Sequence, residues 1–407
     1  MNARRYLNLV ANIGGYRNPK PLARLKTELD TRYFAKNFTP HQWFLTVNGR
    51  TALYLLLESL NLESGSEVLV QSFTCVTAVN PIIWAGLTPI FVDIDTKTLS
   101  AATQSLSERV SAKTRVIVLQ HSFGIPGASK AVKEIAAKHN LIIVEDCAHS
   151  LGVHDQANPL GTMGDAAIFS FGIEKSLQSK FGGALLVSSP DLVKNIETMY
   201  RKLPELSRTQ TFLWLLYPPL RQLIRKSPDW LGRILRRILE LSGILKAAIS
   251  RSELRGKYPK GTPSTMPGVA ATIILESLKT LDSTLAHRQE LTKFYGEWLA
   301  NNHHLVLPGP ANLPLLKYPI ICESEKLRSL IVAALKSKDI YVTDWYRPAL
   351  YPADTNFEAI GYNPASCPQA ESIAERILNL PTGPEIDLSH ATIAANVINH
   401  ATAILSG

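Results

Sequence analysis

The chain has 407 residues, of which 45% are hydrophobic and 19% are charged, and this globular composition excludes a disordered, collagen-like or coiled-coil protein. Its net charge is +9, but residues 201–262 hold 14 Lys and Arg against 4 Asp and Glu, which leaves the remainder close to neutral. A neutral body with one basic segment is not typical of a nucleic-acid-binding protein, so we expect no nucleic-acid partner.

The cysteines and the apolar runs indicate the compartment. Four cysteines at irregular spacing form neither a disulfide framework nor a CxxC metal pair, which favours a reducing compartment. Residues 1–20 lack an apolar core and a cleavage-site pattern, so we expect no secretory signal. We find no apolar run of the ~18 residues that a bilayer-spanning helix needs. We therefore expect a cytoplasmic protein.

Between residues 46 and 189, short apolar runs alternate with amphipathic helical patterns. The runs are 67–71, 89–92, 115–119, 141–144, 166–171 and 184–187. Because these runs are continuous rather than alternating, they predict strands buried on both faces of a mainly parallel sheet. Strand–helix alternation predicts an α/β doubly wound domain, in which ligands bind beyond the carboxyl ends of the strands.

The chain as a whole is predicted to have four parts. We expect a large domain over 1–200, a basic amphipathic insertion over 201–262, a long linking helix over 263–300 and a smaller α+β domain over 301–407.

The first candidate site is at Asn48, Gly49, Arg50 and Thr51, where a glycine turn opens an apolar helix. The free N–H groups and the positive dipole end of a helix suit a phosphate, and the Thr51 hydroxyl adds a further donor. The alternative is a plain helix start in which Asn48 is the N-cap, which is the commoner arrangement.

The second candidate site follows the run at 141–144, where Asp146 and His149 come next. A carboxylate at the carboxyl edge of a central strand is suited to hold a cationic ligand atom, and His149 is close enough in sequence to share that pocket. Taken singly, a helix cap for Asp146 and a satisfied core histidine for His149 are the commoner roles.

The third candidate site extends from Ser170 to Lys175 and is followed by Gly182 and Gly183. A lysine in a cleft after a buried strand has a lowered pKa, because burial disfavours its charged form, and it can then attack a carbonyl to form an imine. A surface lysine is the alternative. Together the three sites supply an anion site, a carboxylate and an imine-forming lysine, which are the groups that pyridoxal phosphate requires.

On these stretches the chain resembles the DegT/DnrJ/EryC1/StrS family of sugar aminotransferases, which have the fold-type I pyridoxal-phosphate transferase architecture. The resemblance extends over nearly the whole chain except the basic insertion. The stretches that carry it are 49–53, 70–80, 85–86, 91–95, 145–152, 164–165, 169–175, 278–288, Tyr346 and 377–381.

The resemblance implies a role for each site residue. Lys175 would be the catalytic lysine joined to the cofactor, Asp146 the partner of the pyridine nitrogen, and His149 the neighbour of the ring hydroxyl. The cofactor phosphate would be held by Gly49, Arg50, Thr51 and Ser170. The resemblance further implies a homodimer that moves an amino group, from glutamate, to a keto group of a nucleotide-linked sugar.

Three positions depart from the family pattern. Cys75 stands where the family stacks an aromatic on the pyridine ring, so stacking of about 1 kcal/mol is missing or supplied from elsewhere. Residues 263–265 replace a segment that reaches the neighbouring subunit's phosphate. Arg50 replaces a usual threonine and is either a second phosphate ligand or a solvated residue at the helix start.

These departures leave other functions open. One is transamination of a membrane- or lipid-linked keto substrate or of a non-sugar ketone. Another is a non-catalytic, cofactor-binding regulatory or membrane-interaction protein, although Lys175, Asp146 and Thr51 together speak against it. We expect no metal site, because no HExxH or similar spacing occurs, and a dehydrogenase is not indicated without a GxGxxG turn.

The basic insertion contains an amphipathic pattern. A helical step places six apolar side chains on one face, opposite Arg233, Arg236, Arg237 and Glu240. The six are Leu231, Ile234, Leu235, Ile238, Leu245 and Ile249. Upstream, the apolar stretch 212–217 is expected to be broken at Pro218 and Pro219.

A basic amphipathic helix beside an apolar hairpin is typical of an interfacial membrane element. We therefore hypothesise a peripheral contact through residues 208–256 with the inner face of a membrane. The alternative is a face packed on the protein's own body or on a second subunit.

Overall fold

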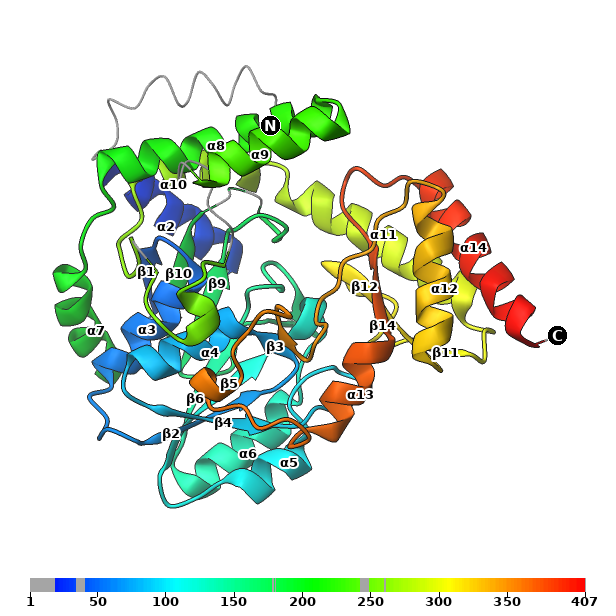
Figure 1. The fold of residues 1–407 in the computed structure, drawn as a ribbon. Helices are drawn as coiled ribbons and strands as arrows, with labels where there is room; N and C mark the ends of the chain where they lie inside the picture. The colour runs from blue at the N-terminus through cyan, green and yellow to red at the C-terminus, as the bar shows by residue number, and fades with distance from the viewer. Residues whose placement is uncertain are drawn as a thin grey trace.

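The computed structural model describes residues 19–33, 41–177, 179, 181–241, 249–259 and 261–406, and its centre is a seven-stranded sheet (Figure 1). The strands, in sheet order, are β1 (Gln42–Thr46), β10 (Gly183–Val187), β9 (Ala166–Ser170), β6 (Ile142–Asp146), β5 (Thr114–Gln120), β2 (Glu67–Gln71) and β4 (Thr88–Val92). The five strands from β9 to β4 are parallel, whereas β10 and β1 complete one edge in antiparallel pairs. The predicted mainly parallel α/β sheet is confirmed.

Continuous apolar runs form these strands because helices cover both faces of the sheet. Successive side chains of a strand point to opposite faces. Val68 and Val70 therefore pack in one buried cluster, while Leu69 packs in another. The flanking helices are α2 (Pro19–Tyr33), α3 (Gly49–Ser59), α4 (Val76–Trp84), α5 (Thr103–Arg109), α6 (Ser129–His139), α7 (Pro190–Lys202) and α10 (Gly268–Leu278).

The C-terminal part forms a smaller α+β unit, on the right in Figure 1. Its antiparallel sheet has the order β11 (Leu305–Val306), β12 (Lys317–Cys322) and β14 (Ile377–Pro381). Its helices are α11 (Leu281–Leu299), α12 (Glu325–Lys336), α13 (Pro368–Arg376) and α14 (Leu388–Ser406). The three predicted boundaries between the four parts of the chain remain predictions.

The prediction of a single long helix over 263–300 is wrong, because the structure has two helices there, α10 and α11. Thr280 lies between them with a non-helical backbone, φ −110° and ψ 6°. The Thr280 hydroxyl donates to the carbonyl of Ser277, and the Ser283 hydroxyl donates to the carbonyl of Thr280. Such local side-chain bonds compete with the regular helix and end it here.

A short parallel pair joins the C-terminal unit to the carboxyl edge of the central sheet. Strand β13 (Leu350–Tyr351) pairs with β3 (Thr74–Cys75), and the N–H of Thr74 donates to the carbonyl of Ala349 at 2.9 Å. This pairing holds the segment that precedes β13 beside the strand ends where ligands are expected.

The basic insertion contains two helices, α8 (Arg208–Lys226) and α9 (Asp229–Leu241), which pack against each other at one end of the molecule (top of Figure 1). The break expected at Pro218 and Pro219 is wrong, because α8 continues through both prolines. Anchoring on the body offsets the lost N–H bonds: Leu215 is fully buried, and Trp214 packs on Phe181 at 5.6 Å between ring centroids. Leu245 lies outside the described residues. Among the helices that the structure describes, none is long and apolar enough to cross a membrane.

Candidate active site

The start of α3 forms the first part of the site. Asn48 is the N-cap, and its side-chain oxygen accepts bonds from the N–H and from the hydroxyl of Thr51, both at 2.9 Å. Gly49 lies against the end of β9, since a Cβ on Gly49 would come within 3.2 Å of the Ser170 Cβ. The Asn48 cap is therefore present, and the same turn brings Ser170 to the positive end of the helix dipole.

Two adjacent carboxylates at the end of β6, Glu145 and Asp146, have different partners. Glu145 accepts a hydrogen bond from His121 Nε2 at 2.9 Å and further bonds from the N–H groups of Gly161, Met163 and Gly164. Burial opposes its charge, but the His121 and backbone bonds lower the pKa of Glu145 overall. Asp146, the next residue, interacts instead with the charge of Lys175. Glu145 thus stabilises the local fold, and Asp146 is the carboxylate of the site.

Burial dominates the electrostatics of Asp146. It raises the pKa of this carboxyl, and the N–H of Ala148 and the charge of Lys175 only partly oppose the rise. The N–H of Ala148 donates to Asp146 at 2.9 Å and fixes its orientation. A buried carboxylate of this kind is stabilised by a cationic partner.

Lys175 lies in the loop after β9, within reach of that carboxylate. Burial lowers the pKa of its amine, while the charges of Asp146, Cys75 and Glu174 partly oppose the shift. A lowered pKa leaves more of the amine unprotonated at a given pH, and only that form is a nucleophile. The alternative of a surface lysine is wrong.

His149 is a buried neutral donor beside Lys175. Burial and the charges of Lys175 and Lys317 hold its pKa well below the usual value. Its Nδ1 accepts the N–H of Phe123 at 3.1 Å, which places the ring proton on Nε2. That Nε2 lies 3.4 Å from the hydroxyl of Tyr346, which belongs to the segment that precedes β13.

Trp345 is a residue of the pocket that the sequence patterns do not identify. Its ring lies parallel to that of His149, with centroids 5.1 Å apart and planes within 2°. Lys175 Nζ lies 4.8 Å from the centroid of the Trp345 ring. The Asn379 amide donates to the carbonyls of Thr343 and Trp345 and fixes this segment. A large aromatic surface from the C-terminal unit therefore lies beside the Lys175 amine, to which Cys75 is also close.

We predict that Trp345→Ala weakens cofactor binding by about five- to tenfold, the equivalent of the ~1 kcal/mol of a lost aromatic contact. The measurement is the dissociation constant of pyridoxal phosphate, from absorbance titration of the cofactor-free protein. Trp345→Phe keeps a ring and should restore most of the affinity. Equal dissociation constants for the wild type and Trp345→Ala would contradict this role.

Arg50 is neither exposed nor solvated. Its side chain is 17% exposed and forms an ion pair with Glu253, which lies in the insertion and is 2% exposed. Burial lowers the pKa of Arg50 to about 10, and nearby Cys75 opposes the shift. The solvated alternative is therefore wrong, and the second-ligand role for the phosphate remains a prediction.

Loss of the Arg50–Glu253 ion pair is expected to lower the stability of the fold. Glu253 also accepts bonds from the N–H and the hydroxyl of Ser250, and its own carbonyl accepts from Asn80 on α4. Removing one partner of a buried pair leaves the other charge uncompensated, at a cost of about 3–5 kcal/mol. We expect Glu253→Ala to lower the free energy of urea unfolding by about this amount, with Glu134→Ala on the exposed surface of α6 as a control of small effect. A decrease below about 1 kcal/mol would contradict the pairing.

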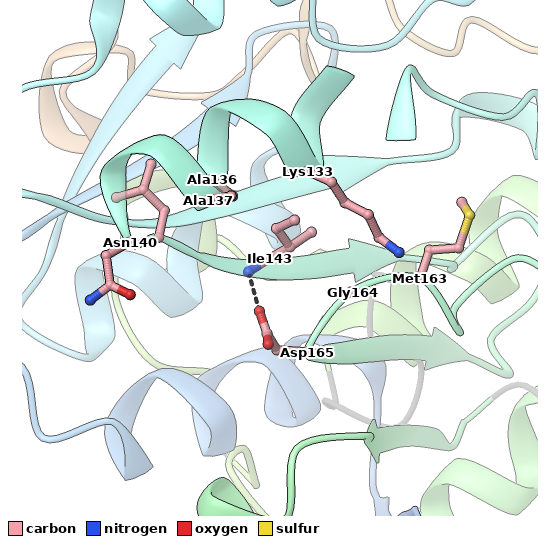
Figure 2. Close-up of a pocket in the computed structure, with 9 residues that line it drawn as sticks. Lys133, Ala136, Ala137, Asn140, Ile143, Met163, Gly164 and Asp165 are labelled. Carbon is pink, nitrogen blue, oxygen red and sulfur yellow. Dashed lines mark hydrogen bonds between the residues drawn. The ribbon is translucent and has the colours of Figure 1, made fainter. Parts of the chain in front are cut away.

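A separate surface pocket lies at the other edge of the sheet. Lys133, Asn140 and Asp165 line it, together with Met163 (Figure 2). Asp165 accepts the N–H of Ile143 at 2.8 Å and so ties the amino-terminal end of β6 to the segment before β9. Because the amino ends of parallel strands are opposite the ligand edge, this pocket is not the candidate site.

The residues at the carboxyl edge fit pyridoxal phosphate in their chemistry. Asp146 suits a protonated ring nitrogen, His149 Nε2–H suits a ring oxygen, and Lys175 suits the aldehyde. The helix start at Gly49 and Thr51, with Ser170 against it, suits the phosphate. The structure thus brings the sequence-predicted residues to one edge of the sheet, while their individual roles stay predictions.

Known proteins give an independent comparison. The model of the DegT/DnrJ/EryC1/StrS aminotransferase family matches residues 31–399. GDP-perosamine synthase of Vibrio cholerae is 30% identical over 193 residues, which span 47% of this chain and 51% of that protein. The spore coat polysaccharide biosynthesis protein SpsC of Bacillus subtilis is 26% identical over 84% of this chain and 81% of its own length. The putative sugar aminotransferase Spr1654 of Streptococcus pneumoniae has the same fold, with a TM-score of 0.76 and 19% identity over 100% of this chain and 98% of that one.

Proposed function

Because the chain belongs to the DegT/DnrJ/EryC1/StrS aminotransferase family, we propose that it transfers an amino group to a keto group of a nucleotide-linked sugar. The enzyme is an aminotransferase that depends on pyridoxal phosphate. The observation that supports the proposal most directly is the buried Lys175 amine, with Asp146 close enough to interact with its charge and Trp345 over it. The relative named GDP-perosamine synthase supports a nucleotide-linked substrate.

The residues divide the work of transamination among them. Bound pyridoxal phosphate supplies an electron sink that weakens a C–H bond of the amino acid. Asp146 would stabilise positive charge at the ring nitrogen of the cofactor, and His149 would donate a hydrogen bond to it from Nε2. Lys175 Nζ, unprotonated more readily because burial lowers its pKa, takes a proton from the substrate and returns it. The ring of Trp345 lies over the amine.

The proposal is tested by a substrate screen. Purified enzyme with pyridoxal phosphate and glutamate is offered GDP-, UDP- and dTDP-linked keto sugars, and 2-oxoglutarate release is followed. We expect release with at least one nucleotide-linked keto sugar and none with the free sugar. Turnover of the free sugar at the same rate would overturn the nucleotide requirement.

We further propose that glutamate is the amino donor, that the enzyme is a homodimer and that it works in the cytoplasm at the inner face of a membrane. Membership of the family supports the donor and the dimer. Four free thiols, at Cys75, Cys147, Cys322 and Cys367, are consistent with a reducing compartment. Light scattering of the purified enzyme is expected to give twice the chain mass of 44.9 kDa.

A further inference from the structure

The helical hairpin of α8 and α9 packs on the body of the protein through some side chains and exposes others to solvent. A Cβ on Gly232 would come within 2.9 Å of the Ile224 carbonyl, so the two helices approach closely at that point. Leu231 and Leu235 are half-buried, whereas Leu215 of α8 is fully buried. The hairpin thus packs on the body of the fold, and other side chains of it, among those that the structure describes, are exposed.

That surface carries an apolar ridge on α9, formed by Trp230, Ile234 and Ile238. These side chains are 60%, 48% and 56% exposed, and their spacing of four residues places them along one face of the helix. On α8, Phe212 and Leu223 are exposed as well. Among the described residues, five of the twelve exposed large hydrophobic side chains lie on this hairpin, so the ridge is a concentration and not scattered surface.

The charges around the ridge indicate which kind of surface it binds. Arg233 and Arg237 are exposed on α9, and residues 201–262 carry a large excess of basic side chains. The rest of the chain is nearly neutral in net charge, so a second copy brings no overall negative charge to match them. A helix with exposed Trp and Ile on one side and Arg beside them matches an anionic lipid surface, where arginines contact headgroups and apolar side chains enter the acyl boundary.

We propose that the ridge of Trp230, Ile234 and Ile238, with Arg233 and Arg237, docks the enzyme on the surface of an anionic membrane. This inference deepens the proposed location at a membrane, on which it rests. It assigns the contact to one helix face and to one lipid chemistry. The active site lies at the carboxyl edge of the central sheet, in a different part of the fold, so docking leaves the chemistry itself unchanged.

The test is flotation of the full-length, cofactor-loaded enzyme with phosphatidylcholine vesicles, with and without about one third phosphatidylglycerol. We expect the wild type to float with the anionic vesicles only. The ridge variant Trp230→Ser/Ile234→Ser/Ile238→Ser should lose at least about tenfold in partitioning. The matched control Leu330→Ser/Tyr341→Ser/Ile393→Ser removes three other large hydrophobic side chains, 43–65% exposed, and should float as the wild type does.

Further variants and measurements separate loss of membrane binding from unfolding and from loss of a dimer interface. Arg233→Glu/Arg237→Glu should also abolish flotation without removing any apolar side chain, and each variant should keep the wild-type circular dichroism and the rate on a soluble substrate. Absence of flotation by the wild type, or equal flotation of the ridge variant, would overturn the proposal. So would a ridge variant that changes from dimer to monomer in light scattering while the wild type binds no vesicles, because the ridge would then be an interface between copies. None of these outcomes depends on turnover, so the proposed reaction is judged separately.

Discussion

Replacing Lys175 with alanine is expected to lower transamination at least about 10³-fold, because the proposed mechanism gives the Nζ atom the proton transfer and because this amine would hold the aldehyde of the cofactor. The buried amine suits both tasks, since burial lowers its pKa and keeps more of it unprotonated. The measurement is the steady-state release of 2-oxoglutarate. In parallel, borohydride reduction should fix a pyridoxyl group on the peptide that contains residue 175 in the wild type and not in the variant.

Two control variants separate the amine from its charge and from its surroundings. Lys175→Arg keeps a positive charge beside Asp146 but has no nucleophilic amine, so it should be as inactive as the alanine variant. Lys326→Ala removes an exposed lysine of α12 and should leave turnover unchanged. If Lys175→Ala retained wild-type rates, the role assigned to this residue would be wrong.

The sequence predicts the central sheet well because its signal is local. The apolar run at 67–71 coincides with β2, and the runs at 166–171 and 184–187 differ from β9 and β10 by one residue. Strand β1 is not identified, because only three consecutive apolar residues form it, at 43–45. The rule that ligands lie beyond the carboxyl ends of parallel strands then selects Asp146 and the segment from Ser170 to Lys175.

The sequence does not predict the parts of the site that distant segments supply. Trp345 reaches the pocket only because β13 pairs with β3, a contact between residues more than 270 positions apart in the chain. Glu253 meets Arg50 across about 200 positions, within a segment whose composition is otherwise basic. Periodicity and spacing describe neighbours along the chain, so neither residue has a local signal that marks it.

At Pro218 and Pro219 the local sequence signal is clear, but packing in the fold outweighs it. Two consecutive prolines predict a break at 218–219, since each removes an N–H bond from the helix. In the structure, α8 is held on the body by Leu215 and Trp214 and continues to Lys226. Packing of an apolar face contributes more than propensity here, which is the usual source of helix stability in proteins.

Replacing Asp146 with asparagine is expected to lower kcat/KM about 10²–10³-fold, because a neutral amide no longer stabilises positive charge on the ring nitrogen. The substitution preserves the size of the side chain and an oxygen acceptor for the N–H of Ala148. Asp165→Asn is the matched control, since Asp165 binds the backbone of Ile143 at the opposite edge of the sheet. We expect that control to keep turnover.

The same Asp146 variant should also change the pH dependence of cofactor uptake, so that uptake persists to lower pH although turnover decreases. The charge of Asp146 raises the pKa of Lys175, so its removal should lower that pKa further below the usual value. Attack on the aldehyde needs the unprotonated amine, and the rate at which cofactor-free protein takes up pyridoxal phosphate falls as the pH drops through the Lys175 pKa. In Asp146→Asn this fall should therefore shift to lower pH, even though turnover decreases. A merely structural loss would lower the uptake rate at every pH without moving the fall, and an unshifted profile would show that Asp146 does not act on Lys175.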